Sequence, residues 1–329
     1  MTTALVLCLV LIPTAALLSR LFGAFMKRAS VGQRISQYAP RLHANKVGTA
    51  TMGGMVIVLL WAMSMLVLYV LGLMPRHGAF VLASGALFGS IGFLDDLLSL
   101  HHRRSLGLSP LQKVILVTCV SAFLFFLFPE GARAPVLVPF SMLVLNPSPF
   151  WAFVLALLVF LGTTNGLNLT DGLDGLAAGI TLLVLVGYVF ILRGADIGIS
   201  IVPLCGIIAG FLWVNTHPAS LFLGDTGSFA LGGILAALAL ASGTALVLPI
   251  LAGVVVLEAG SVILQVCSYR LTGTRVFKVT PLHHHFEYAE GIDYPYLIAG
   301  TDWSEPKITV RFWVLQAFFL VLAMLAVRW

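Results

Sequence analysis

The sequence predicts an all-α, polytopic integral membrane protein, and three observations support this fold class. Of 329 residues, 60% are hydrophobic and only 9% are charged, whereas soluble domains carry about 25% charged residues. Apolar runs of roughly 20 residues, long enough for a helix to cross a bilayer core, recur along the chain. These runs are apolar on every face, which favours helices over the alternating strands of a membrane barrel.

We expect about ten transmembrane helices in a single membrane domain that covers residues 1–329. No Ala-x-Ala-like cleavage site follows the first span, so we expect it to be retained. The four cysteines lie singly within apolar runs, which favours core packing over a disulfide or a zinc site. The expected spans are 4–24, 51–73, 79–96, 111–128, 149–167, 175–193, 198–216, 227–243, 245–269 and 309–328.

Basic residues are distributed unevenly between the two sides of the expected bundle. Because Lys and Arg are retained on the cytoplasmic side, we assign the richer side to the cytoplasm and both termini to the non-cytoplasmic side. Topology control and attraction to anionic lipid account for this basic face, and nucleic acid is not implied. The richer side holds Lys27, Arg28, Arg34, Arg41, Lys46, Arg103, Arg104, Lys113, Arg270, Arg275, Lys278, Lys307 and Arg311, against Arg76, Arg133, Arg193 and Arg328.

Two adjacent carboxylates, Asp95 and Asp96, close the third expected span. Neighbours on a helix point about 100° apart, so the pair need not share one ligand. Adjacent buried carboxylates repel and separate in pKa, which can leave one of them able to act as a base. A solvated helix end is the alternative. Acids near membrane spans are costly unless they pair or bind a cation, which favours a functional role.

The connection between the fifth and sixth spans, residues 163–175, concentrates two Asn, two Asp and three Gly. A capped turn would explain Asp174 and Gly175, but it does not require Asn165, Asn168 and Asp171 as well. Glycines let backbone N–H groups approach a ligand, and a helix N-terminus favours phosphate. The segment therefore suits a pocket for a nucleoside and a metal-bound phosphate.

Asp225 follows Gly224 at the start of the eighth span and could simply cap that helix. Mg²⁺, however, prefers an octahedron of oxygens with only one or two carboxylates, which scattered Asp residues beside a diphosphate provide. We therefore expect Mg²⁺ as a cofactor, with Asp225 as its candidate ligand.

Lys46 and Lys113 each lie just before an expected span. Either ammonium group could neutralise a phosphate. Interfacial anchoring is the alternative for each of them.

Three consecutive histidines, His283, His284 and His285, lie in the last long polar segment. Consecutive residues cannot all face one ion in regular structure, and no Cys or H-x₃-H spacing is nearby. Contacts to phosphate are therefore favoured over a zinc site.

Glu258 differs from the other acids because it falls well inside the ninth span. A buried hydrogen-bonded partner or a helix kink is expected there, with a direct functional role as the alternative.

Together these motifs resemble those of the phospho-N-acetylmuramoyl-pentapeptide transferases (translocase I), within the polyprenyl-phosphate N-acetylhexosamine-1-phosphate transferase superfamily. The resemblance covers nearly the whole chain. The aspartate motifs are shared across the superfamily, whereas the triple-His motif resembles the muramoyl-pentapeptide branch. The motifs are K-x-G-T-x-T-M-G-G from Lys46 to Gly54, F-L-D-D from Phe93 to Asp96, N-x-x-N-L-T-D-G-L-D-G-L from Asn165 to Leu176, G-D-x-G-S from Gly224 to Ser228, and P-L-H-H-H-F-E from Pro281 to Glu287.

The resemblance implies transfer of phospho-N-acetylmuramoyl-pentapeptide from UDP-N-acetylmuramoyl-pentapeptide to undecaprenyl phosphate, giving lipid I and UMP, the first membrane step of peptidoglycan synthesis. It implies a multi-pass protein of the bacterial inner membrane, an active site facing the cytoplasm and a possible homodimer. By this resemblance, the residues associated with catalysis are Asp95, Asp96, Asp225 and His283, and Asp225 is the Mg²⁺ ligand. The candidate binding residues are Lys46, Thr51, Lys113, Asn165, Asn168, Asp171, Gly172, Leu173, Asp174, Asn215, Phe222, His284 and His285, with Thr51 and Lys113 ranked second.

Two features depart from the family pattern. Ala50 stands where the family usually has Pro, which is expected only to loosen a turn. A long Tyr-rich stretch follows Glu287 and alters the cytoplasmic rim of the protein near the His motif. The resemblance therefore does not assign the residues that contact the pentapeptide.

Two other functions and two mechanisms remain as alternatives. A sister transferase that uses UDP-N-acetylglucosamine would share every aspartate motif. An ion-coupled transporter would carry its acids near the bilayer midplane, where only Glu258 is expected. For the transferase, the lipid phosphate could attack in line with Asp95 or Asp96 as the base, or an Asp could first form a covalent intermediate.

Overall fold

The computed structural model describes residues 2–28, 48–102, 107–193, 195–288 and 294–327. These residues are mostly helical, with one antiparallel pair of two-residue strands, β1 (Val136–Leu137) and β2 (Val144–Leu145). The short helices are α5 (Pro129–Ala132), α10 (Leu248–Leu251) and α12 (Leu282–His285). The long helices are α1 (Thr2–Arg28), α2 (Gly54–Val70), α3 (Gly78–His102), α4 (Pro110–Leu127), α6 (Pro149–Thr170), α7 (Leu176–Ile191), α8 (Gly198–Asn215), α9 (Gly224–Ala241), α11 (Gly253–Thr272) and α13 (Glu305–Ala326).

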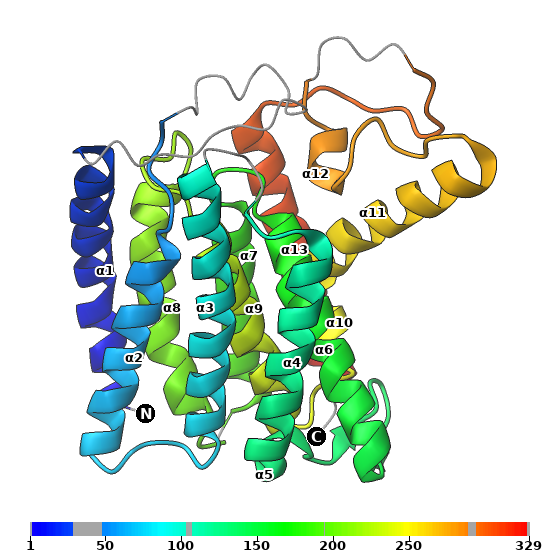
Figure 1. Ribbon diagram of the computed structural model, residues 1–329. Coiled ribbons are helices and arrows are strands. Elements are labelled where there is room, and N and C mark those ends of the chain that lie inside the picture. Colours follow the sequence, from blue (N-terminus) through cyan, green and yellow to red (C-terminus); the bar gives the residue numbers. More distant parts are fainter. Residues whose placement is uncertain (1, 29–47, 103–106, 194, 289–293, 328–329) are drawn as a thin grey trace.

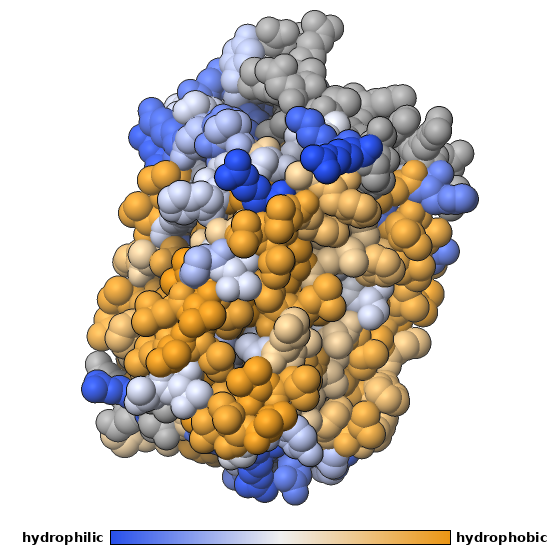
Figure 2. All heavy atoms as spheres, turned by 90° about the vertical axis from the view of Figure 1, so that its left-hand side faces the viewer, coloured by the Kyte–Doolittle hydropathy of each residue, from blue (hydrophilic) through white to orange (hydrophobic). Residues whose placement is uncertain are grey.

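The long helices confirm the predicted fold class. Among the described residues, 8 helices are long and apolar enough to cross a membrane, and α2 and α7 are apolar but shorter. Nine of the ten expected spans each coincide with one long helix, and the ninth in order is divided. On the side of the bundle where α1 lies, a broad apolar band separates two hydrophilic ends (Figure 2). The chain is therefore a multi-pass membrane protein, because such a band matches the apolar interior of a bilayer.

Both termini lie at the lower end of the bundle in Figure 1. Helices α3 and α6 end at the opposite, upper end, and α4, α7 and α9 begin there (Figure 1). The aspartate motifs are carried by these upper helix ends and by the connections between them, and the histidine motif lies at the same end on α12, between α11 and α13 (Figure 1). The alternation of the spans thus collects the motifs on one face of the protein.

Helix α9 forms the centre of the bundle and packs against α3, α6 and α2. Small residues allow the backbones to approach closely where α9 begins. A Cβ atom on Gly92 of α3 would lie 2.0 Å from the carbonyl oxygen of Asp225, and one on Gly54 of α2 would lie 2.1 Å from the nitrogen of Gly227. Larger residues at these positions would separate the helices that carry the aspartates.

The ninth expected span, 245–269, is not one continuous helix, which corrects the sequence-based expectation. It is divided at Ala252 into α10 and α11, and α11 runs obliquely away from the bundle (Figure 1). The side chain of Gln316 on α13 satisfies backbone groups at the break: its Nε2 donates to the oxygen of Leu251 (2.5 Å) and its Oε1 accepts from the nitrogen of Val254 (3.3 Å). An interrupted membrane helix needs such partners because lipid provides none.

Candidate active site

A centre of charged groups forms where α3, α4, α6 and α9 meet. The Nζ atom of Lys113 on α4 donates to Oδ2 of Asp225 on α9 at 2.6 Å and lies 3.1 Å from Oδ2 of Asp95 on α3. The Nδ2 atom of Asn168 on α6 donates to Oδ1 of Asp225 at 2.9 Å and to Oγ of Ser228 at 3.1 Å. We call Asp95, Lys113, Asn168 and Asp225 the carboxylate–lysine centre. The structure thus brings together residues from three of the predicted clusters and Lys113.

The start of α4 explains how Lys113 is positioned. Ser109 and Gln112 form a capping box, in which each side chain bonds the backbone N–H group of the other. One residue earlier, the nitrogen of Leu108 donates to Oδ1 of Asp95 at 2.6 Å. The beginning of α4 is therefore tied directly to the acid that its lysine faces.

Asp96 faces different partners from Asp95, as the 100° spacing of helix neighbours predicts. Its Oδ1 atom accepts from the nitrogen of Asp225 at 3.1 Å, and its Oδ2 atom accepts from the nitrogen and the Oγ1 atom of Thr226 at 2.9 and 2.6 Å. Asp96 thus binds the first backbone N–H groups of α9, which have no partner within their own helix. The carboxylate of Asp225 does not cap α9 and points to Lys113 and Asn168 instead.

The carboxylate–lysine centre offers oxygen atoms of the kind that a magnesium ion binds. Carboxylate oxygens of Asp95 and Asp225 lie 3.1 and 2.6 Å from the ammonium nitrogen of Lys113. Mg²⁺ prefers oxygen ligands with few carboxylates. The residues therefore fit the expected ion, with Asp225 and Asp95 as the groups that would hold it.

A second group of contacts joins the histidine motif to the loop after α6. The imidazole of His283 lies against Gly172, where an added Cβ atom would be 2.2 Å from Nε2. On its other side, Nδ1 of His283 lies 3.1 Å from Oε1 of Glu258, and its backbone nitrogen donates to Oε2 of Glu258 at 3.3 Å. Both side chains are fully buried. Glu258 is thus the buried partner that its position predicted, and that partner is a candidate catalytic residue.

The three histidines face three different partners. His283 faces Glu258, the Nδ1 atom of His284 lies 2.8 Å from Oε2 of Glu287, and Nδ1 of His285 accepts from the nitrogen of Lys278 at 3.1 Å. Burial and, secondarily, the charge of Lys278 hold the pKa of His285 below its usual range. His285 is therefore neutral near pH 7.

A cluster that the sequence did not reveal surrounds Asp174. Its Oδ2 atom lies 3.1 Å from Nδ1 of His217 and accepts from the nitrogen of Ala219 at 3.0 Å. The Oε1 atom of Glu305 accepts from the nitrogen of Asp174 at 2.7 Å. One ligand atom from each of Asp174, His217 and Glu305 lies within 4.8 Å of the others, a spacing that could hold a metal ion. The contacts tie the loop after α6 to the connection after α8 and to the start of α13.

Three further predicted binding residues, Asn215, Phe222 and Asn165, make hydrogen bonds within the protein. Asn215 is buried, and its Nδ2 atom donates to the oxygen of Leu221 at 3.0 Å, while the backbone of Phe222 pairs with Ala50 and Gly53. Asn165 donates to the oxygen of Leu161 in its own helix at 2.8 Å.

Thr51 and Leu173 are buried, and Asp171 caps the end of α6. Lys46 lies outside the described residues. The nucleotide-binding roles of these residues stay predictions.

The fold and this centre define a multi-pass membrane protein with a buried, charged site at one end of its helices. A family model described as "Glycosyl transferase family 4" matches residues 79–243, which contain Asp95, Lys113, Asn168 and Asp225.

Curated relatives extend the likeness over almost the whole chain. The phospho-N-acetylmuramoyl-pentapeptide-transferase of Desulforamulus reducens is 40% identical over 92% of this chain and 89% of the relative. The enzyme of the same name from Heliobacterium modesticaldum is 40% identical over 92% of this chain and 92% of the relative. The one from Geobacillus thermodenitrificans is 36% identical over 95% of this chain and 94% of the relative. The chain belongs to the phospho-N-acetylmuramoyl-pentapeptide-transferase family.

Proposed function

We propose that the protein transfers phospho-N-acetylmuramoyl-pentapeptide from UDP-N-acetylmuramoyl-pentapeptide to undecaprenyl phosphate, forming lipid I and releasing UMP. The relatives support this reaction by their names. The observation that carries the chemistry is the contact of Lys113 with both Asp95 and Asp225 at the end of the membrane helices. Two carboxylates and a lysine beside a polar loop suit the binding of a diphosphate together with a divalent metal ion.

In the proposed reaction, an oxygen of the lipid phosphate attacks the β-phosphorus of the UDP-sugar. A new P–O bond forms, the bond to the UMP oxygen breaks, and UMP leaves with the electron pair. Asp95 and Asp96 are both candidates to accept the proton of the lipid phosphate: Asp95 lies beside Lys113, whereas the oxygens of Asp96 are bound to the start of α9. The charge of Lys113 offsets the negative charge that develops on the phosphate oxygens.

Magnesium dependence is part of the proposal. Asp225, with Asp95 beside it, would hold the ion, and Asn168 orients the Asp225 carboxylate by its hydrogen bond. When bound, the ion would supply charge stabilisation to the diphosphate. Initial attack by an Asp carboxylate remains the alternative, and UMP exchange into the UDP-sugar without lipid phosphate would distinguish it.

We place the uridine near Phe222 and the loop 171–175. Phe222 supplies an aromatic face, and its backbone is held by Ala50 and Gly53. The basic residues at this end of the bundle support an orientation in which the site faces the cytoplasm of a bacterial inner membrane.

The deciding experiment measures UMP release by the purified protein with undecaprenyl phosphate and Mg²⁺. UDP-N-acetylmuramoyl-pentapeptide and UDP-N-acetylglucosamine are supplied in separate reactions. We expect turnover only with the first. Turnover only with UDP-N-acetylglucosamine would assign the protein to the sister reaction, and turnover undiminished by a chelator would remove Mg²⁺ from the proposal.

A further inference from the structure

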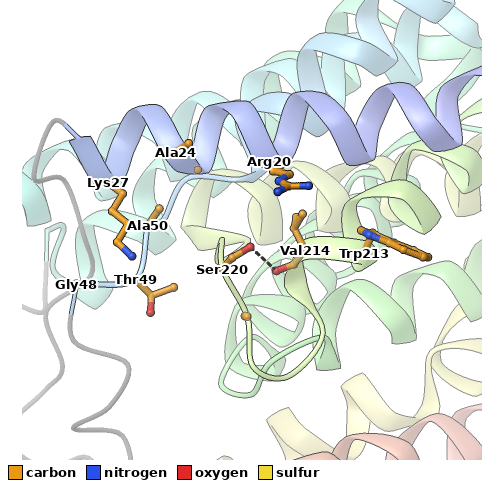
Figure 3. A pocket seen from close by; sticks show the side chains of 11 residues that line it. Arg20, Ala24, Lys27, Gly48, Thr49, Ala50, Trp213, Val214 and Ser220 are labelled. Atoms are coloured by element: carbon orange, nitrogen blue, oxygen red, sulfur yellow. Dashed lines mark hydrogen bonds between the residues drawn. The ribbon is translucent and has the colours of Figure 1, made fainter.

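A cavity of about 670 Å³ lies on the α1 side of the bundle, apart from the carboxylate–lysine centre. It is lined by the last turns of α1, the segment 48–50, the end of α8 and the connection that follows α8 (Figure 3). Helix α1 packs on α8 and α2, whereas the carboxylate–lysine centre is formed by α3, α4, α6 and α9. The function proposed above does not use this cavity.

The cavity wall on α1 has a regular pattern. Arg20, Gly23, Ala24 and Lys27 all line it, and these positions recur on one face of a helix. Two cations, about 10 Å apart along the helix axis, therefore flank two small residues. In Figure 3 both long side chains extend from α1 on the side of the cavity. The small residues leave room between the charges for a ligand.

Among the described residues, the two positive charges have no acidic partner. No described acidic residue lines the cavity, and no described carboxylate pairs with Arg20 or Lys27. Thr49 adds a hydroxyl group to the wall. The cavity therefore offers charge and hydrogen-bonding groups to an anion such as a phosphate.

The surroundings of the cavity are apolar and face the lipid. Leu21 and Phe25 on the same end of α1 are 56% and 65% exposed, and Trp213, which lines the cavity, is 83% exposed. Tryptophan is enriched where membrane helices meet the headgroup region. A ligand with both a phosphate and acyl chains matches this combination better than a soluble anion does.

We propose that the cavity binds the phosphate headgroup of an anionic membrane phospholipid, with its acyl chains along α1. Basic pockets between membrane helices are suited to such headgroups. Binding would stabilise two segments that lead into the candidate active site, residues 48–50 and the connection after α8. Ala50 precedes Thr51, and its oxygen accepts from the nitrogen of Phe222 at 2.8 Å.

The test uses the full chain in phosphatidylcholine nanodiscs that contain a photoactivatable phosphatidylglycerol. We expect labelling of peptides from the cavity wall, and about tenfold less labelling in the double variant Arg20→Gln with Lys27→Gln. The matched control is Arg28→Gln with Arg270→Gln, which removes the same charge at the same end outside the cavity. Ala24→Leu fills the cavity with its charges intact and is expected to lower labelling similarly.

Competition on the unaltered protein keeps the test independent of how the variants fold. Unlabelled phosphatidylglycerol should abolish labelling, whereas phosphatidylcholine and inorganic phosphate should not. Equal losses in the control variant, or labelling unchanged by Ala24→Leu and by the double variant, would overturn the proposal. Displacement by undecaprenyl phosphate but not by phosphatidylglycerol would also overturn it and would assign the cavity to the acceptor lipid.

Discussion

The carboxylate of Glu258, about one and a half turns into α11, lies 3.1 Å from Nδ1 of His283, and neither side chain is exposed. This contact joins a membrane helix to the histidine motif, and the opposite side of the imidazole lies against Gly172. His283 is therefore held between a buried acid and the loop that carries Asp171 and Asp174. We expect Glu258 to act as a positioning residue for His283.

Replacing Glu258 by Gln tests that role. The amide keeps the size of the side chain but removes the charge that faces the imidazole, so kcat should fall by up to about 100-fold through misplacement of His283, with a smaller change in KM. Ser261→Ala is the control, since Ser261 lies on the same helix and donates to the backbone oxygen of Glu258 (2.7 Å), not to its carboxylate. Equal kcat values for the two variants would contradict the positioning role.

Gly172→Ala examines the other side of the same imidazole. The added Cβ atom would lie 2.2 Å from Nε2 of His283, so either the ring or the loop must move. We expect a loss of activity and a lower midpoint of thermal unfolding. Gly162→Ala on α6 is the matched control, because an added Cβ atom there meets nothing within 4 Å. If both alanine variants behave alike, the close contact at Gly172 is not important.

Asp225→Asn tests the proposed metal ligand. The amide loses the charge that faces Lys113 and would bind Mg²⁺ poorly, so turnover should fall by about 1,000-fold at every Mg²⁺ concentration. Asp302→Asn, at a half-exposed acid that pairs with Lys278, is expected to keep normal turnover. Near-normal activity of a folded Asp225→Asn protein would remove Asp225 from the metal site.

Asp96 is expected to contribute to stability as well as to activity. Its oxygens accept three hydrogen bonds from Asp225 and Thr226, and a hydrogen bond to a charged group contributes about 1.5–3 kcal/mol to stability after exchange with water. Asp96→Ala should therefore lower the midpoint of thermal unfolding in detergent more than Asp95→Ala does. The opposite order would show that the start of α9 does not depend on Asp96.

His285 predicts how stability changes with pH. Its pKa is lowered in the folded protein, so the unfolded chain binds a proton first as the pH falls. The contribution of this neutral side chain is fully present above the unfolded pKa of about 6.5 and is lost as the pH falls below that value and through the lower pKa of the folded protein. Between pH 7.5 and 5.5, the decrease in unfolding midpoint should be smaller for His285→Gln than for the unaltered protein.

Much of the fold could be predicted because lipid imposes a simple rule. A membrane span must be helical and apolar over a set length, so the ten segments could be recognised from composition alone. The break at Ala252 could not be recognised in this way. It depends on Gln316, which lies 64 residues further along the chain and satisfies the backbone groups freed at the break.

The candidate site was predictable in its parts but not in its pairings. Acids at span ends are costly without partners, and this cost drew attention to Asp95, Asp96 and Asp225. Which of these acids faces Lys113 and which caps α9 depends on the rotation of α3 against α9. His217 and Glu305 gave little signal, since one precedes a proline and the other begins a helix, both ordinary positions.

The sequence by itself determined the class of protein, the spans and the motifs, because these depend on local composition and on residue types at short spacing. Only the tertiary structure decided that Asp95 and Asp225 share Lys113, that Asp96 holds the start of α9 and that Glu258 holds His283. These contacts join residues far apart in the chain. They form because glycines such as Gly92 and Gly54 let helix backbones meet closely, and that fit is a property of the packed bundle.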